Sequence, residues 1–185
     1  MPLRRAIHKM LYFVTGSRDK FAEAKAILPD IEQFEADLPE IQSIDAEEIA
    51  RAKLEEAAKG REGAFFVEDT SLYLEALGGL PGPLIKWFMK TIGNEGLVTI
   101  AAAFDNTKAT AKTIIGYRGE DGDVRFYEGS LEGSIVSPRG EHGFGWDAIF
   151  MPHGIAMTFA EMSNENKNEN SMRQIALKKL KAALI

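Results

Sequence analysis

A glycine-containing segment near the start of the chain has the residue types of an anion-binding turn. Thr15 ends an apolar run that begins at Leu11, Gly16 and Ser17 close it, and Lys20 lies in the first turn of the helical pattern that follows. Glycine lets a ligand approach the backbone, and unpaired amides at a helix start attract anions. A lysine in that turn opposes the helix dipole, and a bound phosphate would remove the conflict. A plain capped turn with an exposed lysine explains the segment equally well, and the spacing is not that of a Walker A loop.

Lys53 is a charged residue on the apolar side of a predicted helix. Asp45 and Glu48 have the spacing of a capping box at the start of this helix, and Gly60 supplies its end. At about 100° per residue, Lys53 falls inside the apolar stripe and not opposite it. The stripe consists of Ala46, Ile49, Ala50, Leu54 and Ala57. A lysine there either extends past the core to solvent, which is the commoner case, or reaches an anionic ligand.

Two adjacent acidic residues, Glu68 and Asp69, follow an apolar strand predicted over 64–67. At a strand end they would be held rigidly, and Mg²⁺ commonly takes one or two carboxylates together with the phosphates of a substrate. Adjacent residues of a strand point to opposite faces, so a shared metal ion would need a twist or a bulge at this position. The alternative is that Asp69 only caps the turn into Thr70 and Ser71.

Aromatic residues alternate with glycines in a loop of the second half. The loop runs from Ser137 to Asp147 and contains Phe144, Gly145 and Trp146. An aromatic face flanked by glycines can stack on a base, and Asp147 beside it can read the edge of a ring. Equally, Phe144 and Trp146 can fill the core, which is the usual fate of aromatic residues.

Lys167, Ser171 and Arg173 lie at a polar helix start near the C-terminus. Lys167 and Ser171 share a helical face, whereas Arg173 turns away from it. All three can reach one ligand if a helix ends near Ser171 or if Arg173 wraps around. The spacing of Ser171 and Gln174 also fits a capping box.

The elements expected to position these residues mix strands with helices. Strands are predicted at 11–15, 64–67, 110–118, 124–136, 148–151 and 157–160, with a long hairpin formed by 110–118 and 124–136. Helices are predicted at 21–28, 45–59, 84–92, 95–104 and 172–183. The predicted fold class is therefore α/β with a mixed sheet, and the hairpin-rich second half is compatible with a lobe of its own.

The composition limits the classes of function. Of 185 residues, 22 are Lys or Arg and 28 are Asp or Glu, which gives a formal net charge of −6. This acidity argues against a nucleic-acid polymer as partner, although a few local cations can hold a small phosphate ligand. The absence of cysteine excludes disulfides, thiol nucleophiles and cysteine-bound zinc.

Length and hydropathy predict one domain without a membrane span. No apolar run approaches the roughly 18 residues that a span needs, and the basic start precedes an apolar run too short for a secretory signal. We expect a soluble, cytoplasmic protein with no membrane partner. Residues 1–9 are interpreted as a frayed extension and residues 10–185 as a single domain.

Taken together, these segments resemble the inosine triphosphate pyrophosphatase family, whose members hydrolyse non-standard purine nucleoside triphosphates. The matching segments appear in family order and cover nearly all of the chain from about Met10. They are 13–17 with Lys20, 37–40, 67–70, 76–83 continuing into 85–88, 137–140, 144–147, 160–163 with Glu165, 167–168 and 171–173. The resemblance implies an elongated mixed sheet with flanking helices and two lobes around a central active-site cleft.

The resemblance also implies an activity and partners. Family members require Mg²⁺, cut between the α- and β-phosphates, release a monophosphate and pyrophosphate, and work as homodimers. The expected substrates are ITP, dITP and XTP, and the expected role is to cleanse the nucleotide pool.

Carried over by motif, the resemblance assigns roles to individual residues. The triphosphate would be held by Thr15, Gly16, Ser17, Lys20 and Lys53. The metal would be held or surrounded by Glu40, Glu68 and Asp69. The base would be framed by Phe144, Gly145, Trp146 and Asp147, joined by Lys167, Ser171 and Arg173. Asp69 would activate the attacking water, with Lys20 as the second catalytic residue.

Three residues depart from the family pattern. Ser17 stands where Asn is usual, Met172 replaces the usual His before Arg173, and Ala148 follows Asp147 where proline is common. We expect pyrophosphatase activity with weaker discrimination between bases. The alternatives are a related nucleotide pyrophosphatase acting on other modified nucleotides and a nucleotide-binding protein with weakened catalysis.

Overall fold

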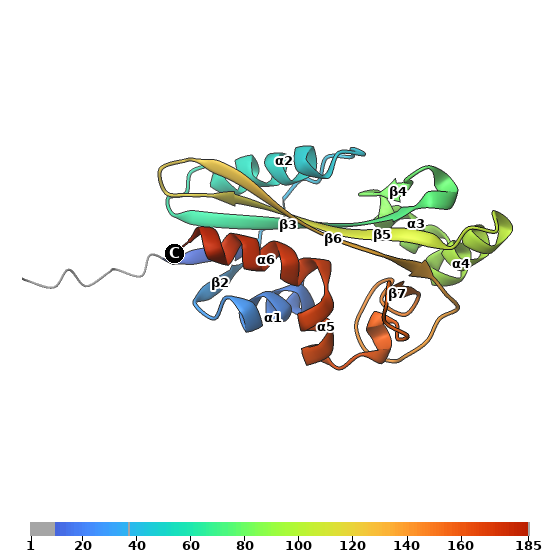
Figure 1. Cartoon of the computed structure of the whole chain (residues 1–185). Coiled ribbons are helices and arrows are strands. Elements are labelled where there is room, and N and C mark those ends of the chain that lie inside the picture. Colours follow the sequence, from blue (N-terminus) through green and yellow to red (C-terminus); the bar gives the residue numbers. More distant parts are fainter. Residues whose placement is uncertain (1–9, 37, 185) are drawn as a thin grey trace, which may run out of the picture.

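One mixed sheet organises the part of the chain that the computed structural model describes, residues 10–36 and 38–184. The extension predicted at 1–9 lies outside these residues. Within them, seven strands follow the order β2-β1-β3-β5-β6-β7, with β4 paired to β3 (Figure 1). The first three strands of this order pair in parallel and the other pairs are antiparallel. The predicted α/β class with an elongated mixed sheet is confirmed.

The bounds of the elements are as follows. The strands are β1 Leu11–Val14, β2 Ile31–Phe34, β3 Ala64–Leu74, β4 Pro81–Gly82, β5 Lys108–Arg118, β6 Val124–Ile135 and β7 Phe150–Pro152. The α-helices are α1 Arg18–Ile27, α2 Ala46–Ala58, α3 Ile85–Thr91, α4 Gly93–Ala103, α5 Asn164–Asn170 and α6 Met172–Ala183. Two 3₁₀ turns, Glu75–Leu77 and Phe159–Glu161, complete the described part. None of its helices is long and apolar enough to cross a bilayer.

Different helices cover the two faces of the sheet (Figure 1). On one face, Leu54 of α2 packs in a cluster with Val67 of β3. On the opposite face, α1 and α6 cover the same end of the sheet, where Phe66 and Leu177 are fully buried. The alternation of side chains along β3 sends successive residues to these two sides. A polar residue of β3 therefore faces either α2 or the α1–α6 pair.

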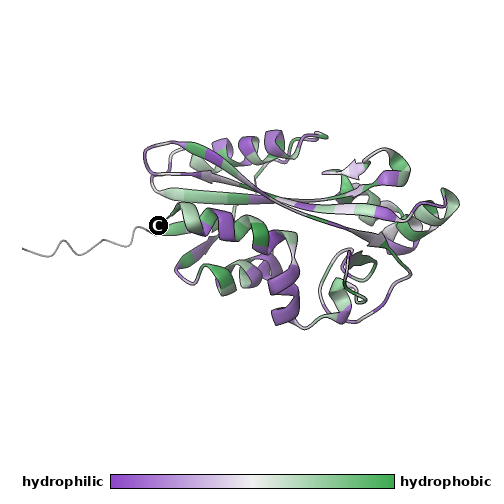
Figure 2. Cartoon of the chain, in the orientation of Figure 1, coloured by the Kyte–Doolittle hydropathy of each residue, from purple (hydrophilic) through white to green (hydrophobic). Residues whose placement is uncertain are grey.

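A third apolar cluster lies at the other end of the sheet. Leu72 of β3, Leu97 of α4 and Phe150 of β7 are fully buried there. Figure 2 shows that α5, in contrast, is hydrophilic along its whole length. Its buried residue is Lys167, which is 3% exposed. Because no apolar face holds α5, the polar contacts of Lys167 are what tie this helix to the molecule.

The largest difference from the prediction is the length of strand β3. The prediction ended the strand at Val67, whereas β3 continues to Leu74 and pairs with β5 without interruption over residues 65–74. Its pairing with the parallel neighbour β1 ends at Phe66. Glu68 and Asp69 thus lie in mid-strand and not at a sheet end, since the backbone ladder to β5 continues where the apolar sequence stops.

Smaller differences concern short elements. Strand β2 was not predicted, and the strand predicted at 148–151 lies at 150–152. The segment 157–160 was predicted as a strand, but it contains no strand and runs into a 3₁₀ turn at Phe159–Glu161. Thr158 and Glu161 make a reciprocal capping box there, and the Thr158 hydroxyl donates to the carbonyl of Arg139. These side-chain bonds satisfy the backbone locally and favour a turn over a strand.

Candidate active site

Two adjoining cavities contain most of the predicted site residues. The wider cavity has a volume of about 430 Å³ and the narrower one about 180 Å³. Lys20 and Lys86 line both, so the two spaces adjoin at these two residues. We call the wider one the phosphate cavity, lined by Val14, Thr15, Gly16, Ser17, Lys20, Ala36, Leu38, Glu40, Lys53, Glu68 and Lys86. We call the narrower one the base cavity, lined by Lys20, Thr70, Ile85, Lys86, Met89, Phe144, Gly145, Trp146, Asp147, Lys167, Met172 and Arg173.

The turn between β1 and α1 forms one wall of the phosphate cavity. Ser17 caps α1, because its Oγ accepts a hydrogen bond from the backbone N–H of Lys20 at 3.3 Å. The backbone N–H of Ser17 donates to Oγ1 of Thr15 at 3.1 Å. A side chain at Gly16 would meet no atom within 4 Å, so the protein itself leaves the space above this glycine open. The turn is thus both a capped helix start and a backbone surface that an anion can approach.

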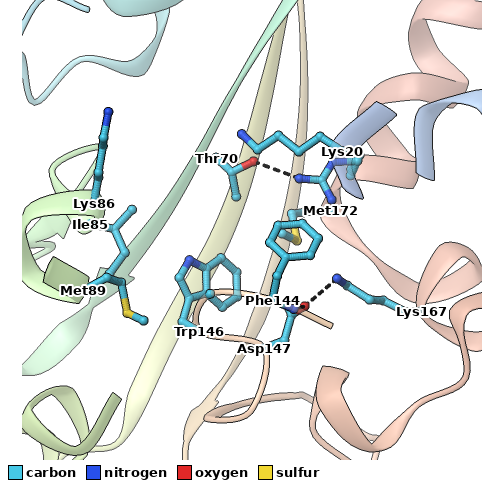
Figure 3. Close-up of a pocket in the computed structure, with 12 residues that line it drawn as sticks. Lys20, Thr70, Ile85, Lys86, Met89, Phe144, Trp146, Asp147, Lys167 and Met172 are labelled. Atoms are coloured by element: carbon cyan, nitrogen blue, oxygen red, sulfur yellow. Dashed lines mark hydrogen bonds and ion pairs between the residues drawn. The ribbon is translucent and has the colours of Figure 1, made fainter. Parts of the chain in front are cut away.

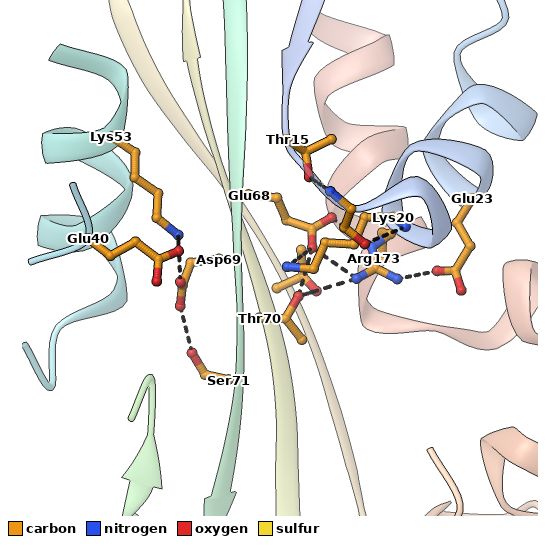
Figure 4. A network of polar contacts seen from close by, with 12 residues as sticks. Thr15, Lys20, Glu23, Glu40, Lys53, Glu68, Asp69, Thr70, Ser71 and Arg173 are labelled. Atoms are coloured by element: carbon orange, nitrogen blue, oxygen red, sulfur yellow. Dashed lines mark hydrogen bonds and ion pairs between the residues drawn. The ribbon is translucent and has the colours of Figure 1, made fainter. Parts of the chain in front are cut away.

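Lys53 crosses from α2 to the sheet, as its position in the apolar stripe suggested. Its Nζ lies 3.1 Å from Oε1 of Glu40 and 3.3 Å from Oδ1 of Asp69 (Figure 4). Nζ of Lys86 reaches the other oxygen of Glu40 at 2.8 Å. Burial raises the pKa of Glu40, but the hydrogen bond from Lys86 and the charge of Lys53 lower it to about 2. Burial lowers the pKa of Lys53, and the charges of Asp69 and Glu40 outweigh burial and raise it.

Glu68 faces the other side of β3. Nε of Arg173 donates to its Oε2 at 2.7 Å and Nη2 donates to Oε1 at 2.9 Å, a bidentate pair in which both side chains are buried (Figure 4). Lys20 adds an ion pair at 3.2 Å, and Thr70 donates to Oε1 at 2.8 Å. Burial raises the pKa of Glu68, but the charges of Arg173 and Lys20 bring it well below its usual range. The carboxylate is therefore ionised and fully engaged.

Phe144 stands in the base cavity between two cations. Nζ of Lys167 lies 4.4 Å from the centre of its ring, and the guanidinium carbon of Arg173 lies 5.7 Å from it. Trp146 is 7% exposed, lines the cavity and packs edge-on against Phe150. Figure 3 shows the two rings between the α3 residues Ile85 and Met89 on one side and Lys167 on the other. Trp146 thus belongs to the core and to the cavity wall, and Phe144 mainly to the cavity.

Asp147 connects the aromatic loop to α5. Its Oδ2 accepts hydrogen bonds from the backbone N–H of Phe144 at 2.8 Å and from Nζ of Lys167 at 2.6 Å. Burial raises the pKa of Asp147 above its ordinary value, although Lys167 and the Phe144 amide oppose this effect. Lys167 also donates to Glu23 at 2.8 Å. The loop is consequently held by buried polar bonds on the side facing α5.

A break between α5 and α6 brings Lys167 and Arg173 to one cavity, which matches one of the two arrangements considered from the sequence. Ser171 stands at the break, and its Oγ accepts from the backbone N–H of Gln174 at 3.2 Å. Ser171 is buried and lines neither cavity. The structure therefore gives it the capping position, while Lys167 and Arg173 point into the site.

Three residues of the site were missing from the sequence prediction. Glu23 of α1 bonds both Lys167 and Arg173, Thr70 lines the base cavity, and Lys86 lines both cavities. Glu23 lies one turn after Lys20, so helical spacing from that lysine could have suggested it. Thr70 and Lys86 lie within segments that matched the family pattern, but their side-chain directions depend on the continuation of β3 and on where α3 begins.

Comparison with known proteins gives matches over almost the whole chain. A model of the Ham1 family matches residues 11–183. The chain belongs to the Ham1 family. The inosine triphosphate pyrophosphatase of Schizosaccharomyces pombe is 42% identical over 95% of both chains, and that of Yarrowia lipolytica is 46% identical over 93% of this chain and 94% of its own.

Solved structures place the fold in the same family. The Ham1 protein of Staphylococcus aureus superimposes with a TM-score of 0.82 at 28% identity, over 95% of this chain and 98% of its own. A nucleoside-triphosphatase named dITP/XTP pyrophosphatase from Mycobacterium abscessus gives a TM-score of 0.70 at 27% identity, over 92% of this chain and 98% of its own. The predicted family and fold class are both confirmed.

The carboxylates of this Ham1 protein differ in how well they suit a metal ion. Glu40 and Asp69 both contact the ammonium of Lys53, so a cation already stands between them. Glu68 lies on the other face of β3, and the unbroken register with β5 provides no bulge that would turn it. Within the described residues, no group of three or more acidic or histidine side chains is close enough to hold a metal. Two carboxylates with substrate phosphates are a usual donor set for Mg²⁺. Glu40 and Asp69 supply such a pair, and Lys53 would have to leave the space between them for the ion to bind.

Proposed function

We propose that this protein hydrolyses the non-standard purine nucleoside triphosphates ITP, dITP and XTP to the monophosphate and pyrophosphate, with Mg²⁺, and so cleanses the cytoplasmic nucleotide pool. It is a hydrolase of acid anhydrides, as its curated relatives are. The observation that carries the proposal is the junction of two unlike cavities, one lined by lysines and one by aromatic rings, at Lys20 and Lys86. A nucleoside triphosphate has the matching arrangement of an anionic chain joined to a flat base.

The triphosphate fits the cavity of about 430 Å³. The β1–α1 turn offers the backbone amide of Gly16, and Lys20, Lys53 and Lys86 supply positive charge. Each of these lysines is paired with a carboxylate in the structure. Phosphate oxygens would replace these carboxylates as partners, so the cations are oriented before the substrate arrives.

Asp69 is the proposed general base. Its Oδ1 faces Lys53 and its Oδ2 accepts from the hydroxyl of Ser71 at 3.2 Å, which fixes the carboxylate on the α2 side of β3. A carboxylate so held can orient a water and take its proton. Mg²⁺, when bound by Glu40 and Asp69, would neutralise charge on the phosphate oxygens. Lys20 would stabilise the negative charge that develops during phosphoryl transfer.

The base would stack on Phe144 in the cavity of about 180 Å³. A 6-keto oxygen needs hydrogen-bond donors, whereas the 6-amino group of adenine needs acceptors. Lys167, Arg173 and the backbone amides of the aromatic loop are donors. Met172 lines the same cavity and offers no polar hydrogen. Selection at this edge of the base would therefore rest on Lys167, Arg173 and the loop, and we propose that it is weaker than is usual in the family.

Two further expectations belong to the proposal. A homodimer follows from the family resemblance. A related pyrophosphatase acting on other modified nucleotides is the second candidate, favoured by the apolar edge that Ile85, Met89 and Met172 give to the base cavity. A panel of modified purine and pyrimidine triphosphates separates the two, since the proposal expects ITP, dITP and XTP to be hydrolysed fastest.

The direct test measures pyrophosphate release from ITP with Mg²⁺ by wild type and by Asp69→Asn. Asn keeps the shape of the side chain and removes the base, so release should fall by roughly 100-fold to 10,000-fold. Asp123→Asn is the matched control, because Asp123 pairs with the exposed Arg125 at 2.7 Å, whereas Asp69 pairs with Lys53 of the site. Absence of release by wild type would refute the enzymatic proposal. Unchanged release by Asp69→Asn would refute only the role of Asp69.

A further inference from the structure

A single side chain joins α4 to the aromatic loop of the base cavity. Nδ2 of Asn94, in the first turn of α4, donates a hydrogen bond to the backbone carbonyl of Gly145 at 3.2 Å. No other hydrogen bond or ion pair joins residues 83–104 to residues 137–147 in the described part of the chain. Asn94 itself does not line the cavity. Any effect of Asn94 on the base therefore passes through the peptide that it holds.

The bonded peptide has unusual freedom and an unused donor. Gly145 adopts a φ of +63°, in the left-handed region, where a side chain would be strained. Its carbonyl and the N–H of Trp146 belong to one planar trans peptide and point in opposite directions. Within the described residues, the N–H of Trp146 donates to no protein acceptor. Fixing the carbonyl toward α4 consequently turns a free N–H away from α4.

The rest of the loop is anchored at other peptides. Asp147 accepts from the amide of Phe144, and the N–H of Asp147 donates to the carbonyl of Phe144. Neither bond fixes the rotation of the peptide between Gly145 and Trp146. The adjacent glycine permits that peptide to turn, so the bond from Asn94 is what selects one orientation.

The role of residue 94 requires a hydrogen-bond donor, which asparagine has and a carboxylate lacks. Oδ1 of Asn94 is buried without a hydrogen-bond partner, which is unfavourable for a polar atom. An acidic residue would suit the first turn of a helix better, because of the helix dipole, but a carboxylate could not donate to the Gly145 carbonyl. The hydrogen bond that Asn94 makes through its side chain is therefore the one that Nδ2 donates to Gly145.

We propose that Asn94 is a positioning residue for base recognition: it fixes the Gly145–Trp146 peptide so that the N–H of Trp146 is presented to the 6-keto oxygen of the purine. The inference rests on the proposed function. The N–H would favour a keto oxygen over the amino group of adenine, so the loss of Asn94 should weaken the binding of inosine nucleotides and leave that of adenosine nucleotides unchanged.

The test compares Asn94→Ala and Asn94→Asp with wild type. Asp keeps the size of the side chain and lacks the donor, so it separates the hydrogen bond from packing. Asn106→Ala is the matched control, since Asn106 donates from just beyond the other end of α4 to Glu75 at 3.4 Å, away from both cavities. The measurements are kcat and KM for ITP and ATP, and the Kd values of inosine and adenosine monophosphate by calorimetry.

Both Asn94 variants should raise the KM for ITP and the Kd of inosine monophosphate by about five-fold, the value of one net hydrogen bond. The kcat for ITP and both adenine constants should stay within about two-fold of wild type, as should every constant of the Asn106→Ala control. Unchanged inosine constants, or equal losses for inosine and adenosine nucleotides, would overturn the role of Asn94. Failure of wild type to hydrolyse ITP would instead refute the proposed function, and the monophosphate Kd values would then decide the role of Asn94 by themselves.

Discussion

The phosphate cavity and the base cavity both contain paired charges, but they hold them differently. In the phosphate cavity the pair of Lys53 and Glu40 remains partly exposed, with 40% of the Glu40 side chain accessible. In the base cavity, Arg173 and Lys167 are 2% and 3% exposed and bind carboxylates that are also largely buried. Exposed pairs exchange partners easily, whereas buried pairs resist separation because an unpaired charge would remain in a medium of low polarity.

This difference suggests a division of labour. Lysines that can leave Glu40 are free to exchange this carboxylate for the phosphates of a substrate, and to move when a metal ion binds. Cations that are fixed by Glu23, Glu68 and Asp147 present a constant pattern to the base. The base cavity, with its buried ion pairs, would select the substrate. The phosphate cavity, with its partly exposed ion pairs, would act on it.

The largest expected effect comes from removing a buried ion pair of the base cavity. Arg173→Met removes the bidentate partner of the buried Glu68 and one of the two cations that contact Glu23, so the free energy of unfolding should fall by about 3–5 kcal/mol. Urea unfolding followed by circular dichroism measures it. Arg125→Met, which removes an exposed pair with Asp123, should change stability by less than about 1 kcal/mol. Similar losses in the two variants would contradict the distinction between buried and exposed pairs.

The partly exposed ion pairs of the phosphate cavity should matter little for stability and more for metal binding. Glu40→Gln should lower the free energy of unfolding by no more than about 1 kcal/mol, because the pairs of Glu40 are partly exposed. Its affinity for Mg²⁺, measured by titrating activity, should fall at least about ten-fold, since even residues that only support a metal ligand are worth that much. A Glu40→Gln protein with normal Mg²⁺ dependence would exclude Glu40 from the metal site.

Acid should affect base selection through Asp147. Its pKa is raised by burial and by the charge of Glu23, with Lys167 opposing, so it gains a proton at a higher pH than an ordinary aspartate. As the pH falls, Lys167 loses this partner, and the ratio of kcat/KM for ITP to that for ATP should fall. The phosphates titrate alike in both substrates, and their effect cancels in the ratio. A ratio that is constant with pH down to the onset of acid unfolding would contradict this role.

The raised pKa of Asp147 also affects the free energy of unfolding, and acid acts on it in the opposite direction to its effect on base selection. A carboxyl whose folded-state pKa exceeds its unfolded value contributes most to stability when it is protonated, and this contribution is lost as the pH rises. Protonation of Asp147 should therefore alter selection without unfolding the protein. Circular dichroism at each pH separates the two effects.

The smallest expected effect concerns Met172. Wild type should hydrolyse ITP faster than GTP and ATP by only a small factor, since the cavity edge at Met172 provides no polar hydrogen. Met172→His should raise the preference for ITP over ATP by about five-fold, the value of one net hydrogen bond. A sharp preference for ITP in wild type would contradict the weaker discrimination expected from this residue.

Much of the fold could be predicted because local patterns carry it. The β1 strand, the helix α2 and the β5–β6 hairpin follow from hydrophobic period, caps and turn residues. The full length of β3 could not be predicted, since the polar residues 68–71 have the composition of a turn and are held by the ladder to β5. Long-range pairing of this kind leaves no local signal.

The site shows the same limit. Lys53 was found because a charge inside an apolar stripe is a local anomaly, and the structure shows its ammonium between two carboxylates. Glu23 was missed because an acidic residue on a polar helix start is unremarkable until α5 and α6 pack beside it. The separation of Glu68 from Asp69 was foreseen from strand alternation, which depends only on the backbone.

The central claim is that the base cavity selects the nucleotide and that its triphosphate is hydrolysed in the adjoining phosphate cavity. Separation of the products formed from ITP with Mg²⁺ tests it most directly. The account predicts inosine monophosphate and pyrophosphate in equal amounts. Formation of the diphosphate and inorganic phosphate, or no turnover at all, would contradict it.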